Sequence, residues 1–538
     1  MKIEGRIIDV FERRIYSAEI SIKDGFIEGI EEVYKSYSNF ILPGLIDSHV
    51  HIESSMCTPG AFAGTAVSRG TVAVVSDPHE IANVLGMDGI QFMIGDSEKV
   101  PVKFFFGAPS CVPATTFETN GAAINHKMID TLLRSEKIKY LAEMMNFPGV
   151  INEDQEVIKK LETAKKYRKP IDGHAPGLTG EMLKKYVSSG ISTDHECTTI
   201  DEAREKIGLG MKILIREGSA ARNLDELKSL MLSDPEMVML CSDDLHPEML
   251  LEGHINKLVA RLISEGYDLF DVIRSCTLNP ALHYNLNTGI LKPGYPADFI
   301  IVDDYTRMNV LQTWINGKPV FDKGNLLFNY SGALKINKFN CSEIRTGDIE
   351  MQTMNKKIRL IEAFDGSLFT RGRIVEMGED FPGKSDSSSD ILKIVVKDRY
   401  SDSPPAVGFI KGFGLQMGAL AGSVSHDSHN IISVGTNDTD ITSAINEIVR
   451  LKGGLALAVN DNINSMQLEI AGIMTDKPVQ KVAEEYNILS DMAKTLGCSF
   501  LAPFMTLSFM ALPVIPELKM TDKGLFDVSK FSHVPLFA

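Results

Sequence analysis

The sequence predicts an α/β protein whose main domain is a (β/α)8 TIM-like barrel, with a small composite β-sandwich domain and an additional C-terminal α+β domain. Three observations predict the barrel. Eight short apolar runs recur between residues 44 and 243, helix-like stretches separate most of them, and histidines or carboxylates stand where the runs end. Strands that alternate with helices imply parallel βαβ units. A barrel of such units carries its site at the carboxyl ends of its strands.

The expected barrel strands are short and rich in β-branched and aromatic residues. They cover residues 44–50, 71–76, 102–107, 139–144, 169–174, 190–195, 211–216 and 237–243. Helices are expected between them, for example over residues 154–166 and 224–232. Residues 43–287 are therefore predicted to form the barrel domain.

Two short groups of strands flank this barrel. Residues 3–33 alternate apolar and polar side chains, and Lys23-Asp24-Gly25 is a turn signal between two of the runs. Similar runs return at residues 299–302 and 313–320. A composite β-sandwich built from residues 1–42 and 288–330 is therefore expected.

The composition shifts after about residue 335, and residues 335–538 are predicted to be the C-terminal α+β domain. Thr439 or Asp440 is expected to cap a helix over residues 441–451. Residues 495–516 carry no charge and are long enough to cross a bilayer. Pro503 and two further prolines interrupt any continuous helix there, so this segment is predicted to be buried core or an interface, with no membrane partner.

The bulk composition disfavours several classes of protein. The net charge of -16 argues against a nucleic-acid partner, because binding to a phosphate backbone depends on Lys and Arg patches. The 7 cysteines form no C-x-x-C pair, which argues against a disulfide framework or a thiolate zinc site. Charges close to Met1 do not fit a signal peptide. A cytoplasmic protein is expected.

The strongest chemical signal is the pair His49 and His51 at the end of the first barrel strand. Residues i and i+2 of a strand point to the same face, so both imidazoles can reach one metal ion. Further candidate ligands stand at the ends of later strands. The predicted ligand set is His49, His51, Glu143, His174, His195 and Asp243. This set can hold two divalent ions, which activate water near neutral pH, so hydrolysis is the predicted reaction class.

These residues resemble the amidohydrolase superfamily over about residues 1–325. The resemblance rests on residues 43–51 (PGLIDSHVH), His174, His195, Asp243 and the exit segment 292–298 (KPGYPAD). Finer detail resembles the adenine deaminase family. The matching segments are 49–56 (HVHIESSM), 76–80 (SDPHE), 173–177 (GHAPG), 193–196 (TDHE), 215–220 (IREGSA), 241–244 (CSDD), 425–430 (SHDSHN) and 505–509 (MTLSF).

The resemblance implies conversion of adenine and water to hypoxanthine and ammonia, as a step of purine salvage. It implies two divalent metal ions, with Mn2+ as the first choice and Fe2+ or Zn2+ as alternatives, and a homodimer or higher homo-oligomer. Asp243 is then expected to move the proton from the nucleophile to the leaving amine. A carboxylic acid protonates N1 of the purine, with Glu80 and Glu217 as the catalytic candidates and Glu196 as another.

A second group is expected to contact the substrate or to support the metal ligands. Its members are Glu53, His79, Arg216, Asp244, His426 and His429. Several have ordinary structural explanations as well. Asp244 could cap a helix, and Arg216 could form a structural ion pair with Glu217. A spacing of three residues would place His426 and His429 on one face of a helix, although no local signal predicts that helix.

Neighbouring families fit less well, and two alternative functions stay open. A barrel with a carboxylated bridging lysine needs Lys where this chain has Glu143, and the mononuclear deaminases need a Glu where it has Gly177. The base-flipping zinc deaminases need a Pro-Cys-x-x-Cys run, which is absent. One alternative is an amide-cleaving relative such as an N-acetyl sugar deacetylase. The other is a binding protein on a barrel that has lost its activity.

Overall fold

The computed structural model describes residues 1–219, 221–351, 357–377 and 383–538. Ala220, the last residue of the matching segment 215–220, lies outside them. The chain divides into two compact units. The barrel unit comprises Met1–Pro78, Gln91–Cys111 and Ile124–Ala333, and the C-terminal unit comprises His79–Ile90, Val112–Ala123 and Leu334–Ala538.

Eight parallel strands form the centre of the barrel unit, each within its predicted range or one residue beyond it. They are β5 (Leu45–Val50), β6 (Thr71–Ser76), β7 (Lys103–Ala108), β8 (Ile138–Met144), β9 (Ile171–Gly173), β10 (Thr193–Asp194), β11 (Lys212–Arg216) and β12 (Val238–Cys241). Strands β5 to β9 form one parallel sheet and β10 to β12 a second. Backbone hydrogen bonds join the sheets at both edges, from Ser192 to Ile171 at 2.9 Å and from Asp243 to His49 at 2.9 Å. The TIM-like barrel is thereby confirmed.

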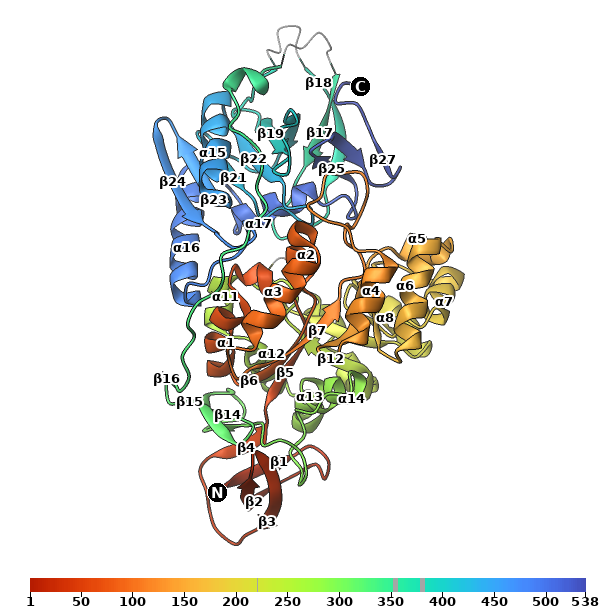
Figure 1. Ribbon diagram of the computed structural model, residues 1–538, viewed down its shortest axis with the longest axis vertical. Coiled ribbons are helices and arrows are strands. Elements are labelled where there is room, and N and C mark those ends of the chain that lie inside the picture. Colours follow the sequence, from red (N-terminus) through yellow and green to blue (C-terminus); the bar gives the residue numbers. More distant parts are fainter. Residues whose placement is uncertain (220, 352–356, 378–382) are drawn as a thin grey trace. The chain divides into compact units, whose positions relative to one another are not determined.

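Helices cover the outside of these strands, and α4 and α6 pack on β8 while α8 packs on β11 (Figure 1). Asp154 caps α6, since its side chain accepts hydrogen bonds from the amides of Glu156 and Val157. The helices of this unit are α1 (Pro59–Ser68), α4 (His126–Arg134), α5 (Phe147–Ile151), α6 (Gln155–Lys166), α7 (Gly180–Ser188), α8 (Ile200–Gly208), α9 (Leu224–Leu227), α10 (Leu230–Ser233), α11 (Pro247–Glu252), α12 (Ile255–Ser264), α13 (Leu269–Ser275) and α14 (Leu278–His283). α3 (Met87–Ser97) begins in the C-terminal unit and ends in the barrel unit.

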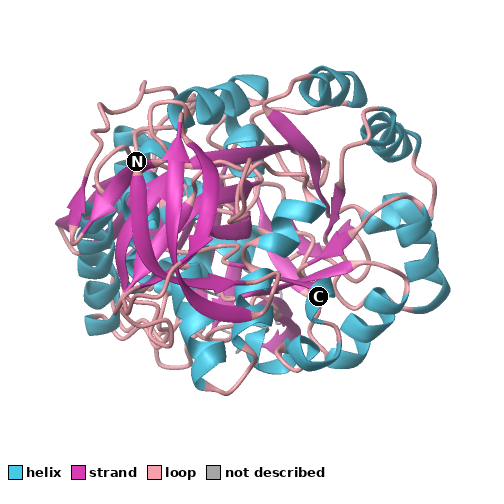
Figure 2. Cartoon of the chain, turned by 90° about the horizontal axis from the view of Figure 1, so that it is seen from below, coloured by secondary structure: helices cyan, strands magenta, loops and turns pink. Residues whose placement is uncertain are grey.

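One sheet of the barrel unit combines strands from both sides of the barrel sequence, the segments for which the sequence predicted a composite β-sandwich. Its order is β16 (Asn325–Leu326), β15 (Lys318–Asp322), β14 (Val310–Ile315), β13 (Phe299–Val302), β4 (Phe40–Pro43), β1 (Lys2–Asp9), β2 (Arg14–Lys23) and β3 (Phe26–Glu32). Red and green strands therefore lie side by side in Figure 1, and Figure 2 shows the curvature of the strands beside the N-terminus. Asp24 and Gly25 both have positive φ, which suits the tight turn between β2 and β3.

The C-terminal unit contains a second large sheet. Its order is β18 (Arg371–Glu376), β17 (Lys357–Glu362), β20 (Ala406–Lys411), β19 (Leu392–Lys397), β22 (Ile431–Gly435), β21 (Ala419–Gly422), β23 (Gly454–Val459) and β24 (Asn462–Gln467). Its described residues also form a three-stranded sheet of β25 (Leu518–Thr521), β26 (Gly524–Asp527) and β27 (Ser532–His533), and the helices α2 (His79–Leu85), α15 (Asp438–Leu451), α16 (Val479–Thr495) and α17 (Pro503–Ser508).

Two details of the C-terminal unit bear on the predictions. The expected cap of α15 is wrong, because the helix begins earlier and its N-cap is Asn437, which accepts a hydrogen bond from the amide of Asp440. The uncharged segment 495–516 is buried over α17, as predicted. No helix among the described residues is long and apolar enough to cross a membrane.

Candidate active site

Two histidines and one aspartate meet at the carboxyl ends of β5 and β12. His49 and His51 are buried, and their Nε2 atoms lie 3.1 Å apart. The Oδ1 atom of Asp243 lies 3.4 Å from the Nε2 atom of His49 and 3.3 Å from that of His51. Asp243 has a positive φ of 55°, which an Asp tolerates better than most residues and which directs its side chain at the end of the strand.

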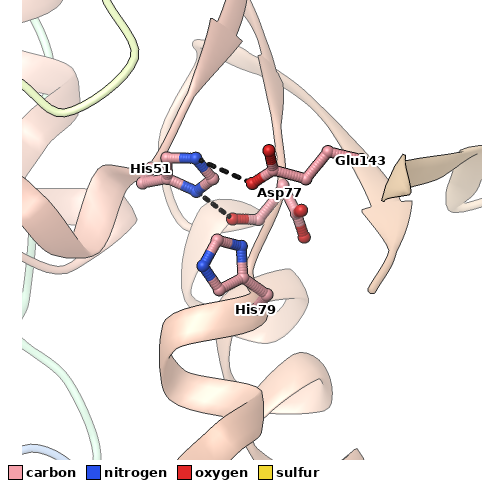
Figure 3. A group of neighbouring side chains, drawn as sticks. All are labelled: His51, Asp77, His79 and Glu143. Carbon is pink, nitrogen blue, oxygen red and sulfur yellow. Dashed lines mark hydrogen bonds and ion pairs between the residues drawn. The ribbon is translucent and has the colours of Figure 1, made fainter. Parts of the chain in front are cut away.

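Glu143, the penultimate residue of β8, lies among three of the predicted histidine ligands. One oxygen, Oε1, is 3.3 Å from the Nε2 atom of His51. The other, Oε2, is 2.7 Å from the Nδ1 atom of His174 and 3.2 Å from the Nε2 atom of His195. Figure 3 shows the contact between His51 and Glu143, and also the bond of 3.1 Å from the Nδ1 atom of His51 to the backbone carbonyl of Asp77. Glu143 can therefore link two groups of ligands.

The charges in this cluster stabilise one another. Burial alone would raise the pKa of the Glu143 carboxyl, but the adjacent His174, His195 and His51 hold it well below its usual range. Burial likewise opposes the charge on His195, yet Glu143 and Asp243 raise its pKa to about 9. The Glu143 carboxylate and the His195 imidazolium therefore favour each other's charged form. A divalent cation would supply positive charge at the same place.

Arg216 completes this charge arrangement from the end of β11. Its Nη1 atom donates hydrogen bonds to Glu196 and Asp243, both at 2.5 Å, while its Nη2 atom donates to Glu196 at 2.8 Å. Burial of Asp243 favours its neutral form, but Arg216 outweighs this and holds the pKa of the carboxyl well below its usual range. The partner of Arg216 is thus Glu196 rather than the neighbouring Glu217 that the sequence suggested.

Residues outside the predicted ligand set make buried hydrogen bonds that hold these strand ends in place. Asp47 accepts bonds from the amide of Ser242 at 3.0 Å and from the Nε2 atom of His254 at 2.8 Å. The hydroxyl of Tyr186 donates to the carbonyl of Met144 at 2.9 Å and accepts from the amide of His174 at 3.0 Å. Sequence reasoning missed these roles. Only Asp47, a charged residue inside an apolar strand, carried a signal that could have revealed one of them.

The remaining candidates divide between the two units. Glu53 is buried after β5, and the Ser54 hydroxyl donates to Asp244 at 2.5 Å. Glu217 lines a pocket of about 240 Å³ with Arg222 and Arg261. The other four candidates belong to the C-terminal unit: His79, Glu80, His426 and His429. His79, which is labelled in Figure 3, is the first residue of α2.

The donor atoms at the strand ends fit divalent metal ions. The barrel unit has three sets of residues, and within each set the potential ligand atoms lie within 4.8 Å of one another. They are His49, His195 and Asp243; Glu143, His174 and His195; and His51, Asp243 and Asp244. The Nδ1 atom of His49 is buried without a hydrogen bond, so this ring retains an unsatisfied donor or acceptor. Mixed imidazole and carboxylate ligands suit Mn, Fe and Zn.

A parallel barrel with histidines and carboxylates at its strand ends defines a class of hydrolase. The model of the Amidohydrolase family matches residues 40–320, which include every barrel strand and strands β4, β13 and β14 of the composite sheet. The protein is an amidohydrolase.

The C-terminal part of the chain and its full-length relatives identify a particular family among the amidohydrolases. The model of the adenine deaminase C-terminal domain matches residues 367–532. An adenine deaminase of Methanosarcina barkeri is 52% identical over 548 residues, covering 99% of each chain. An adenine deaminase of Borreliella burgdorferi is 48% identical over 544 residues, again covering 99% of each chain. The chain belongs to the adenine deaminase family.

We expect Arg216→Gln to destabilise the barrel unit strongly. The substitution leaves Glu196 and Asp243 buried beside each other without a cation, and loss of one partner of a buried ion pair costs about 3–5 kcal/mol. Urea unfolding of the metal-free protein measures the loss. Arg307→Gln, at a side chain that is 84% exposed, is the control and should change the unfolding free energy by less than about 0.5 kcal/mol. Equal stability of the two variants would contradict the assigned role of Arg216.

Proposed function

We propose that this protein is an adenine deaminase, which hydrolyses adenine to hypoxanthine and ammonia, and that the reaction takes place at the strand ends of its barrel. Likeness over the whole chain to adenine deaminases supports the choice of substrate. The observation that carries the choice of site is the position of Glu143 between His51 on one side and His174 and His195 on the other.

Six residues, which we call the Glu143 group, would hold two divalent ions in this proposal: His49, His51, Glu143, His174, His195 and Asp243. Mn2+ is the first choice, and Fe2+ or Zn2+ are alternatives. When bound, such ions supply Lewis-acid activation of water near neutral pH. Glu143 contacts histidines with both of its oxygens, which suits a ligand shared between two ions.

Asp243 is proposed to take the proton from the attacking water and to deliver it to the departing amine. Arg216 keeps this carboxyl ionised, which is the form that a proton acceptor needs. Arg216 thus acts as a positioning residue, through two of its hydrogen bonds. Water attacks C6 of the purine, the bond from C6 to the exocyclic nitrogen breaks, and that nitrogen leaves as ammonia.

The acid that protonates N1 stays a prediction among Glu80, Glu217 and Glu196. Burial would raise the pKa of Glu196, but Arg216 and His174 hold it down, so this carboxyl is a poor proton donor. Burial raises the pKa of Glu217 despite the adjacent Arg222, which favours the protonated form. The pKa of Glu80 lies well below its usual range, because three histidines outweigh its burial. Of the three carboxyls, Glu217 is the one whose pKa is raised.

The wider biological setting is also a proposal. We also propose a homodimer or higher homo-oligomer and a role in purine salvage, which follow from the family resemblance, and a cytoplasmic location, which follows from the cysteine pattern and the charges near Met1. The proposed domains are residues 1–42 with 288–330, residues 43–287 and residues 335–538. We assign Glu53, His79, Arg216, Asp244, His426 and His429 to substrate contact or to support of the ligands.

The test of function is an assay of the purified protein supplied with Mn2+. We expect a change in the ultraviolet spectrum of adenine and release of one equivalent of ammonia, with no change for adenosine, cytosine or an N-acetyl sugar phosphate. Removal of metal with a chelator should abolish the change, and added Mn2+ should restore it. An unaltered adenine spectrum in the metal-loaded protein would overturn the choice of substrate.

A further inference from the structure

A second group of buried histidines and carboxylates lies in the C-terminal unit, around Glu80. His79 and Glu80 form the first turn of α2. The other members come from the turn between β21 and β22. The group, which we call the Glu80 cluster, consists of His79, Glu80, His426, Asp427 and His429, and no member is more than 4% exposed.

Both oxygens of Glu80 contact imidazoles. The Oε1 atom is 2.5 Å from the Nδ1 atom of His426 and 3.4 Å from the Nε2 atom of His79. The Oε2 atom faces the Nε2 atom of His429. Asp427 adds a second carboxylate, whose Oδ1 atom lies 4.0 Å from the Nε2 atom of His79. One carboxylate among three imidazoles is also the arrangement around Glu143.

The contact between Glu80 and His429 brings two further potential ligand atoms together. The Oε2 atom of Glu80 and the Nε2 atom of His429 belong to buried side chains and face each other at ion-pair distance. A carboxylate oxygen and an imidazole nitrogen that converge inside the protein are donors that a divalent transition-metal ion uses.

Neighbouring residues hold the donors in place. The amide of His429 donates to the carbonyl of Ser425 at 2.7 Å, and the amide of His426 donates to the carbonyl of Ser508 at 3.2 Å. The ring of His426 stacks on Phe509 with centroids 4.3 Å apart. On the other side of the turn, the hydroxyl of Tyr400 donates to the carbonyl of Ser428 at 2.6 Å. Fixed side chains of this kind lower the entropic cost of binding an ion.

We propose that the Glu80 cluster binds a divalent transition-metal ion of its own, in addition to the two assigned to the Glu143 group. The potential ligand atoms of His79, Glu80 and Asp427 lie within 4.8 Å of one another, and His426 and His429 complete the set. Imidazole with carboxylate suits Mn2+, Fe2+ or Zn2+, whereas Mg2+ and Ca2+ prefer ligands that are all oxygen. The turn of residues 425–430 thus serves as a metal-binding element.

The test is a count of Mn2+ per chain by elemental analysis after loading and desalting. We expect three equivalents in the parent protein and two in both Asp427→Asn and His429→Gln. The control, His126→Gln, changes a partly exposed histidine that pairs with Glu156 and should retain three. Two equivalents in the parent, or three in both cluster variants, would overturn the proposal.

A second measurement decides the matter if the variants fail to fold. Anomalous diffraction at the Mn edge from crystals of the loaded parent protein should show a peak between Glu80 and His429, and no peak there would overturn the proposal. Neither measurement uses adenine. A protein that fails to deaminate adenine but shows this ion would contradict the proposed function alone.

Discussion

We expect the Asp243→Asn protein to turn over adenine at least about a thousandfold more slowly than the parent while keeping nearly all of its metal. Asn has the size of Asp and retains one side-chain oxygen as a ligand, but its amide cannot accept the proton that Asp243 is proposed to move. The backbone should tolerate the change, because Asn also adopts the positive φ of 55° found at this residue.

Two measurements separate a chemical role of Asp243 from a structural one. Steady-state rates with adenine report the chemistry, and elemental analysis reports the metal content. Asp304→Asn is the matched control, since Asp304 makes its local hydrogen bonds to Thr306 in a surface turn. Normal turnover by the Asp243 variant would remove Asp243 from the mechanism. Loss of both activity and metal would reassign it to metal binding alone.

Glu143→Gln should have an equally large effect for a different reason. Gln keeps the shape of Glu but removes the charge that lies within 3.3 Å of three histidine nitrogens. An amide is a poor shared ligand, so the variant should lose the ions assigned to the Glu143 group, and with them at least about a thousandfold in turnover. Elemental analysis and the adenine assay measure the two losses.

The same variant also changes the protonation of its neighbours. Glu143 helps to raise the pKa of His195 to about 9, so its removal should lower that pKa. Nuclear magnetic resonance titration of the metal-free protein can follow the imidazole signals. Glu162→Gln, on the exposed face of α6, is the control and should alter neither metal content nor turnover. Full metal content in the Glu143 variant would exclude a bridging role.

Local sequence patterns were sufficient to predict the barrel. An apolar run that ends in a histidine or a carboxylate predicts a buried strand and a candidate functional end at once, and this is why His49, His51 and His195 could be placed at strand ends without a structure. The helix over residues 154–166 was predicted for a similar reason, because Asp154 and the helical periodicity act within a few residues of each other.

Local sequence patterns could not predict contacts between residues that are far apart in the chain. Asp47 and His254 are 207 positions apart, and nothing near His254 reveals that its ring holds the end of β5. The spacing of His426 and His429 suggested a shared helix face, whereas the structure places them in a turn where Glu80 lies between them. The predicted N-cap of α15 was wrong by only a few positions along the chain, because Asn437, Thr439 and Asp440 are all good capping residues.

The sequence by itself determined which residues are candidates for the chemistry, since strand periodicity sends His49 and His51 to one face and the parallel topology brings the strand ends together. Only the tertiary structure decided how their charges are balanced. Arg216 neutralises Glu196 and Asp243 rather than its neighbour Glu217, because adjacent residues at a strand end point in different directions while side chains from neighbouring strands converge. That convergence also gathers the Glu80 cluster from segments 346 residues apart.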